Sequence, residues 1–316
     1  MPALVISLDF ELFWGVADSR TIAQYRRNVE GEWHAIPKIL ALFRRYGIRA
    51  TWATVGMLMC RDYFQWRAIR PSALPDYDRL KCSTYLLDSV VRENPRLFFS
   101  RELVKQILDT PGQEIGSHSY SHYFCGEEGA TPEQFAADLV CAREIGRELG
   151  VEYRSFVFPR NQVKDKCLVE LKSAGYRVFR GNPDHWVYRD GHVVPGGIAG
   201  RIVRKSDSYF PLSGNHVSYS RNSPTDDGLL DVPASFFLRP ASGNRILDSF
   251  HLNRVKRGML EAAATDGTFH LWWHPHNFGI NLDQNMKNLE SILQYYFYLA
   301  GNYGMRSASM ADFSAA

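Results

Sequence analysis

The sequence opens on an apolar run that ends in two acids, ALVISLDFE at residues 3–11. A short run rich in β-branched residues is typical of a strand buried on both faces, as in a parallel sheet covered by helices. Because side chains alternate across a strand, Asp9 and Glu11 project from one face and Phe10 from the other. The run therefore predicts a buried first strand that delivers two carboxylates at its end.

Strand and helix patterns alternate along the rest of the chain. We expect strands at 48–55, 114–117, 155–158, 177–179, 268–273 and 305–309, and helices at 33–46, 102–108, 131–149, 164–174, 245–264 and 282–300. Such alternation favours a parallel sheet, and no Pro/Ser/Gly-rich linker divides the chain. We therefore expect one barrel-like domain over residues 1–316.

Two irregular regions interrupt this alternation. The first, at about 58–98, is longer than a usual connection, so it either shapes a substrate groove or merely decorates the surface. The second, at about 182–230, is dense in Gly, Ser and Asn, which is typical of a long loop near the site or of a small flap with strands of its own. We interpret both as insertions.

Composition narrows the class of protein. Hydrophobic residues make up 45% of the 316 residues and charged residues 22%, as in ordinary globular proteins. A net charge of +3 does not indicate a nucleic-acid partner or a polybasic membrane anchor.

The five cysteines are odd in number and form no Cys-x-x-Cys pair, which is typical of reduced thiols. The N-terminal apolar run has no basic segment before it and is interrupted by Asp9, so we expect a cytoplasmic protein without a membrane span.

Two histidines lie four residues apart in GSHSYSH at residues 116–122. On a helical turn, His118 and His122 would share one face and could offer imidazole nitrogens to a single ion, although such a pair is often only a polar surface patch. A carboxylate with two imidazoles is a common ligand set for a catalytic divalent cation. If Glu11 completes that set, Asp9 remains as a candidate general base.

The candidate residues share a position relative to the predicted strands. Asp9, Glu11, His118, Arg160 and His274 all come at or just after strand ends. In barrels of parallel strands the catalytic groups lie at the carboxyl ends of the strands. We therefore expect these side chains to meet at one end of the fold.

These motifs, in this order, resemble the NodB homology domain of the polysaccharide deacetylases, carbohydrate esterase family 4. The stretch His118-Ser119-Tyr120-Ser121-His122 matches the His-Ser/Thr-x-x-His metal motif of the family. The stretch Ser7-Leu8-Asp9-Phe10-Glu11 resembles its first motif, in which one aspartate is the base and a second acid is a metal ligand. Leu271-Trp272-Trp273-His274 resembles the late motif whose histidine is the general acid, with His276 as a competitor.

Two further motifs depart from the family pattern. Phe158-Pro159-Arg160-Asn161 stands at the place of the motif whose arginine orients the catalytic aspartate, but here the arginine follows the proline. Asp184 and Trp186 stand, with altered spacing, where the family has an Asp and a Trp that support the histidine. We place Asn161, Asp184, Trp186 and His276 beside the substrate or behind the catalytic groups.

The resemblance implies a distorted seven-stranded (β/α) barrel that hydrolyses an N-acyl group, N-acetyl first, from an amino sugar. The substrate would be a polysaccharide or its nucleotide- or lipid-linked precursor, as in surface-polysaccharide biosynthesis. Glu11, His118 and His122 would hold a divalent metal, with zinc first and cobalt, nickel or manganese as alternatives. Asp9 would be the base, His274 the acid, and Arg160 would orient Asp9.

Other functions remain open at this point. One is a deformylase or an allantoinase-like C–N amidohydrolase on the same scaffold. Another is a degenerate sugar-binding protein, which the altered arginine and Asp/Trp motifs support. A retaining glycosidase is disfavoured, because Asp9 and Glu11 on one strand face cannot easily flank a glycosidic bond.

Overall fold

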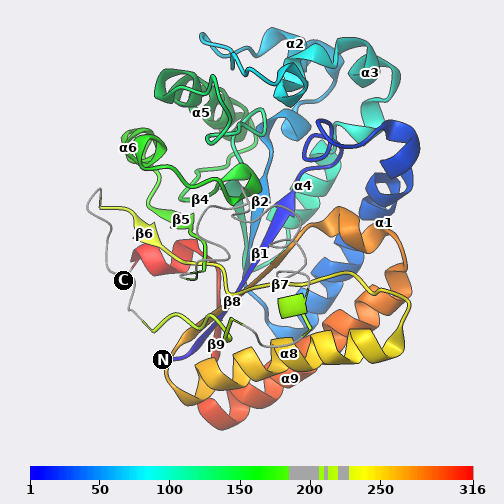
Figure 1. Cartoon of the computed structure of the whole chain (residues 1–316), viewed down its shortest axis with the longest axis vertical. Helices are drawn as coiled ribbons and strands as arrows, with labels where there is room; N and C mark the ends of the chain where they lie inside the picture. The colour runs from blue at the N-terminus through cyan, green and yellow to red at the C-terminus, as the bar shows by residue number, and fades with distance from the viewer. Residues whose placement is uncertain (184, 186–205, 210–212, 220–227, 316) are drawn as a thin grey trace.

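The computed structural model describes residues 1–183, 185, 206–209, 213–219 and 228–315 (Figure 1). At its centre is a nine-stranded sheet whose strands pair in parallel, in the order β6-β5-β4-β3-β2-β1-β8-β7, with β9 beside β1. The strands are β1 Ala3–Phe10, β2 Ala50–Thr54, β3 Gln113–Ser117, β4 Ser155–Val157, β5 Val178–Arg180, β6 Leu230–Asp231, β7 Phe236–Phe237, β8 Thr268–Trp273 and β9 Arg306–Ala308.

Strand β1 is the buried strand that the sequence predicts. All eight of its residues are buried, and it lies in the middle of the molecule (Figure 1). It pairs with β8 on one side and with β2 on the other, where Asp9 stands opposite Ala53. Because the strands are parallel, their carboxyl ends meet at the end where Asp9 lies.

Residues 229–238 join the two ends of the curled sheet. In their first half, Leu230 N donates to Arg177 O at 2.9 Å, on the β5 side. In their second half, Leu238 N donates to Trp272 O at 2.8 Å, on β8. β6 and β7 are thus two halves of one segment that bridges β5 and β8. The predicted barrel-like α/β fold is confirmed, but nine strands are described where seven were expected, because β6 and β7 in this segment were not predicted.

Helices cover the outside of the sheet (Figure 1). They are α1 Ile22–Tyr46, α2 Tyr63–Ala68, α3 Asp88–Glu93, α4 Arg101–Leu108, α5 Pro132–Glu148, α6 Asp165–Ser173, α8 Arg245–Ala264 and α9 Leu282–Tyr303. Helix α1 begins well before the predicted start at 33. There, Thr21 and Gln24 form a capping box in which each side chain accepts a hydrogen bond from the other residue's backbone N–H.

Aromatic side chains fasten α1 to the sheet. Trp52 on β2 and Trp273 on β8 flank β1 and both contact Phe43 of α1, with ring centroids 6.3 Å apart in each pair. All three side chains are fully buried. Burying an aromatic side chain of this size stabilises a fold by roughly 1.5–3 kcal/mol, so these contacts fix α1 against the strands that carry the site.

The region at 58–98 packs over the loop that follows β1. It contains α2, α3 and several short 3₁₀ turns rather than an extended loop. Trp14 donates from Nε1 to Phe98 O at 2.8 Å, and its ring lies 5.6 Å from that of Trp66 in α2. The region at 182–230 falls largely outside the described residues.

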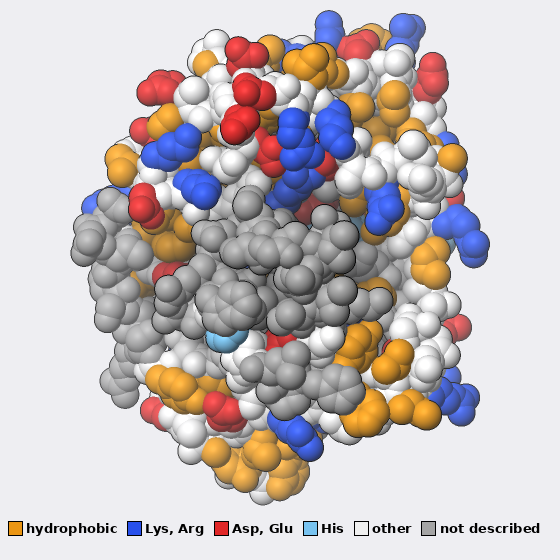
Figure 2. Space-filling view, viewed as in Figure 1, with side chains coloured by type: hydrophobic (Ala, Val, Ile, Leu, Met, Phe, Trp, Pro, Cys, Tyr) orange, Lys and Arg blue, Asp and Glu red, His pale blue; other side chains and the backbone are white. Residues whose placement is uncertain are grey.

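Charged side chains of both signs are interspersed over the upper part of the face shown in Figure 2. Within the described part of the chain, no helix has the length and apolarity needed to cross a bilayer.

Two glycines allow α1 to approach the turn that follows β8. A Cβ added to Gly31 would lie 2.3 Å from the backbone O of Gly279, in the 3₁₀ element Pro275–Gly279. We predict that Gly31→Ala lowers the free energy of unfolding by about 1–3 kcal/mol, because the close-packed backbones cannot accept a methyl group. Urea unfolding measures the change.

The matched control is Gly301→Ala in α9, where an added Cβ meets nothing within 4 Å. It should leave the free energy of unfolding unchanged or raise it by up to about 1 kcal/mol, as expected for a glycine replaced in a helix. Equal effects of the two substitutions would contradict the close approach.

Candidate active site

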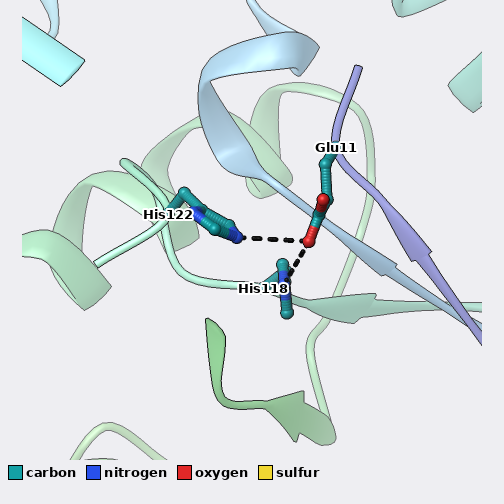
Figure 3. Close-up of side chains that lie close together, drawn as sticks. All are labelled: Glu11, His118 and His122. Carbon is teal, nitrogen blue, oxygen red and sulfur yellow. Dashed lines mark hydrogen bonds and ion pairs between the residues drawn. The ribbon is translucent and has the colours of Figure 1, made fainter. Parts of the chain in front are cut away.

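Glu11 lies between two histidines from another part of the chain (Figure 3). Its Oε1 is 2.9 Å from His118 Nε2 and 3.1 Å from His122 Nε2. All three side chains are buried, and one candidate ligand atom from each lies within 4.8 Å of the others. The structure therefore brings together the carboxylate and the imidazole pair that the sequence singles out.

The His118 ring has a fixed orientation. Its Nδ1 lies 2.8 Å from Val157 O, and since a carbonyl only accepts, Nδ1 carries the proton. When Nε2 carries no proton, its lone pair points at the Glu11 carboxylate. Two acceptors 2.9 Å apart in a buried site repel each other unless a proton or a cation bridges them. A histidine held by a backbone carbonyl is a common support for a metal ligand.

The 118–122 stretch forms a loop, and the expected helical turn is wrong. Ser119 and His122 have positive φ values of 61° and 58°. The Asp138 carboxylate on α5 accepts hydrogen bonds from Tyr120 N at 2.6 Å and from Ser121 N at 3.0 Å. These backbone N–H groups therefore donate to a side chain instead of to the carbonyl groups of a helix. Burial raises the pKa of Asp138 to about 6, although these hydrogen bonds oppose the rise.

The charges of the cluster suit a divalent cation. Burial alone would raise the pKa of Glu11, but His274, His122 and His118 together hold it well below its usual range. Burial lowers the pKa of His122, although Glu11 opposes this. An ionised carboxylate and an unprotonated imidazole are the forms in which these groups bind metals.

Asp9 is held by Arg180, the last residue of β5. The guanidinium donates from Nη1 to Asp9 Oδ1 at 2.7 Å and from Nη2 to Oδ2 at 2.8 Å. Arg180 is fully buried and lies over the ring of Trp272, with 4.3 Å from Cζ to the ring centroid. Burial favours the neutral form of Asp9, but Arg180 outweighs it and lowers the pKa of the carboxyl. The Asp9 carboxylate is therefore fixed in its ionised form.

From the sequence we expect Arg160 to orient Asp9. The structure does not bring these two side chains together. The Arg160 guanidinium forms ion pairs with Asp18 and with Glu127, and the position on Asp9 is taken by Arg180. Sequence reasoning missed Arg180, although an arginine that ends the buried strand VFR was a visible signal. Asn161 lies nearby, and its Oδ1 accepts a hydrogen bond from Arg180 Nη2 at 2.9 Å.

His274 follows β8 and faces both acids. Its Nε2 lies 3.8 Å from Asp9 Oδ2 and 3.7 Å from Glu11 Oε1, and its side chain is 23% exposed. His276 stacks behind it, with ring centroids 5.0 Å apart, and is buried. Burial lowers the pKa of His276 to about 3, so this ring is neutral near pH 7. Asp184 and Trp186 lie outside the described residues.

A cleft of about 330 Å³ opens onto these groups. Its lining combines the acids and histidines with side chains that sequence reasoning did not single out, namely Arg20, Tyr25 and Asn277. Trp272 lines the cleft, whereas its neighbour Trp273 is in the core, as strand alternation requires. The cleft can therefore admit a polar substrate to the two carboxylates.

Residues 30–179 match the family model described as polysaccharide deacetylase. These residues belong to the polysaccharide deacetylase family. The match confirms the resemblance seen in the sequence, and it supports a hydrolase that deacetylates sugars. No curated protein matches the chain in sequence.

Several solved structures share the fold of this chain at low sequence identity. A putative polysaccharide deacetylase from Mycobacterium smegmatis aligns with a TM-score of 0.61 and 13% identity, covering 99% of this chain and 90% of that chain. A probable polysaccharide deacetylase from Pseudomonas aeruginosa PAO1 aligns with a TM-score of 0.55 and 13% identity, covering 99% and 89%. The Puue allantoinase gives a TM-score of 0.58 and 12% identity, covering 99% and 89%.

We predict that Arg180→Met lowers the free energy of unfolding by about 3–5 kcal/mol at pH 7.5, because it leaves the buried Asp9 carboxylate without a counter-charge. Urea unfolding measures this loss. Adding Asp9→Asn to Arg180→Met should recover part of it, since the unpaired charge is then removed.

Arg26→Met is the control, since Arg26 pairs with Glu30 on the surface, where such pairs contribute little. A similar small loss for both arginines would show that the Asp9 pair does not stabilise the fold.

Proposed function

We propose that this protein is a metal-dependent hydrolase that removes an N-acyl group, N-acetyl first, from an amino sugar. One observation carries the proposal: Glu11, His118 and His122 converge in a buried cluster beside an ionised Asp9. The polysaccharide deacetylase match is the independent support for the reaction class. A single domain over residues 1–316 is part of the proposal, because β9 near the end of the chain pairs with β1.

Glu11, His118 and His122 would hold the cation. One carboxylate and two imidazoles suit zinc, and they also suit cobalt, nickel or manganese. When bound, a divalent cation of this kind acts as a Lewis acid on the amide carbonyl and lowers the pKa of water. The fixed ring of His118 and the ionised state of Glu11 are the structural features that fit such a cation.

The protein's own groups would then move the protons. Asp9, ionised and oriented by Arg180, accepts a proton from the attacking water. His274, at the wall of the cleft, donates a proton to the departing amine as the C–N bond breaks. Amide and water thus give a carboxylic acid and the free amino sugar. His276 is buried behind His274, which favours His274 as the acid.

One side chain of the cleft could recognise a negatively charged group of the substrate. Arg20 lines the cleft and makes no ion pair or side-chain hydrogen bond within the described residues. A free guanidinium beside a sugar site suits the phosphate of a nucleotide- or lipid-linked amino sugar. We therefore propose that the reaction belongs to surface-polysaccharide biosynthesis. The five cysteines are free and buried, which supports a cytoplasmic location.

A degenerate sugar-binding function is less well supported. The altered arginine motif was its main argument, yet Arg180 places a guanidinium on the Asp9 carboxylate from a different strand. The positive charge that the arginine motif of the family would place beside Asp9 is therefore present, supplied by Arg180.

We predict that Asp9→Asn and His122→Ala separate catalysis from metal binding. Asp9→Asn should reduce turnover of an N-acetyl amino sugar by about 10²- to 10⁴-fold while the bound cation is retained, because it removes only the base. His122→Ala should lose both cation and turnover. Metal content by elemental analysis and released acid on a panel of N-acyl amino sugars measure the two effects.

The identity of the released acid separates the related reactions, since acetate indicates a deacetylase and formate a deformylase. Loss of the cation from the Asp9 variant would make Asp9 a ligand rather than the base. A wild-type protein that binds the cation but releases no acid from any member of the panel would favour the sugar-binding function.

We predict that Arg20→Gln lowers kcat/KM for a nucleotide-linked N-acetyl amino sugar by about 10-fold through KM, because one charge-assisted hydrogen bond to phosphate is lost. Hydrolysis of the free N-acetyl amino sugar should change little. The control is Arg27→Gln on the exposed side of α1, which makes the same change in net charge. Equal losses on both substrates would remove the argument for an anionic substrate.

A further inference from the structure

Four arginines line a pocket at the opposite end of the sheet from the acids. Arg143 and Arg147 come from the last turns of α5, while Arg154 and Arg177 immediately precede β4 and β5. The pocket encloses about 480 Å³ and shares no lining residue with the cleft beside Asp9. It lies where parallel strands begin, whereas the candidate active site lies where they end.

The fold brings these guanidinium groups together. Arg143 and Arg147 are four residues apart, so they share one face of α5. Arg177 N donates to Arg154 O at 2.9 Å, which sets the two residues side by side at the start of neighbouring strands. Arg143 rests over Gly175, where an added Cβ would lie 3.0 Å from its Nη1. Two of the arginines are thus carried by a helix, and the other two stand directly before strands.

The positive charge of the pocket is not balanced by the other residues that line it. None of the four arginines makes an ion pair or a side-chain hydrogen bond within the described residues. The lining has one acid, Glu152, so four positive groups and one negative group leave a charge of +3 (4 − 1). The C-terminal end of α5 favours the two helical arginines, but Arg154 and Arg177 have no such partner. Arg143 and Arg147 are like charges four residues apart on one helix, so they repel each other in the free protein.

We propose that this pocket binds a diphosphate group. A guanidinium is planar and offers paired donors that match phosphate oxygens, and four of them supply enough donors for two phosphates. The open, mainly polar pocket suits a small multivalent anion better than an apolar ligand. Because the pocket is remote from Asp9, the diphosphate would be recognised there independently of the deacetylation chemistry.

The test measures binding with three probes that share the diphosphate group but differ in its source. Inorganic pyrophosphate and uridine diphosphate are titrated by calorimetry. Phosphatidylcholine vesicles, with and without a polyprenyl diphosphate, are compared by co-sedimentation. The variant replaces Arg143 and Arg177 by Gln together, and the control replaces Arg27 and Arg257, two exposed arginines elsewhere on the surface, by Gln together. Both variants change the net charge equally.

We expect at least one probe to bind the wild-type protein and to bind the Arg143→Gln/Arg177→Gln variant about 100-fold more weakly, since two charge-assisted contacts are lost. The control should bind within about 2-fold of wild type. Thermal unfolding without ligand should show the pocket variant to be at least as stable as wild type, because a like-charge repulsion has been relieved. The proposal would be overturned if no probe bound the wild-type protein, or if binding were weakened equally in the pocket variant and the control. The test is independent of the proposed function, because it requires neither metal content nor deacetylase activity.

Discussion

The paired hydrogen bonds between Arg180 and Asp9 are the interaction on which the end of the barrel depends. Taking two charges out of water is costly, and the cost is recovered only where the remaining donors and acceptors are satisfied. Here Ser7 and Asn161 accept further hydrogen bonds from the guanidinium and Trp272 covers its face, although the Arg180 Nε has no hydrogen-bond partner within the described residues. Ser7 is in turn bonded to His270 on β8, whose Nδ1 donates to Val232 O in the closing segment. One polar network therefore ties β1 to β5, β8 and the segment that joins them.

Local sequence patterns reveal much of this architecture. A buried apolar run ending in acids and a histidine pair after another strand place Asp9, Glu11 and His118 at strand ends, and parallel strands bring such ends together. The helix at 245–264 and the strand at 268–273 are found at their predicted bounds. Each of these features depends on residues close together in the chain.

What the sequence does not reveal depends on distant partners. Arg180 and Asp9 are 171 residues apart. Nothing in either segment indicates which arginine will pair with which acid across the sheet. The shape of the 118–122 loop is decided by Asp138, a polar residue on the buried face of α5, whose position among apolar neighbours was the available signal. The early start of α1 required recognition of the Thr21 and Gln24 capping box.

The segment at 229–238 has a consequence for the behaviour of the unligated chain in solution. Strands at the rim of an open sheet offer unpaired amide and carbonyl groups to other molecules, which promotes edge-to-edge aggregation. Here a single ten-residue stretch occupies the rims of both β5 and β8, through bonds such as Val232 N to Phe179 O and Ser235 N to His270 O. Detachment of this one stretch would expose two strand rims at once, so colloidal stability and closure of the barrel are properties of the same residues.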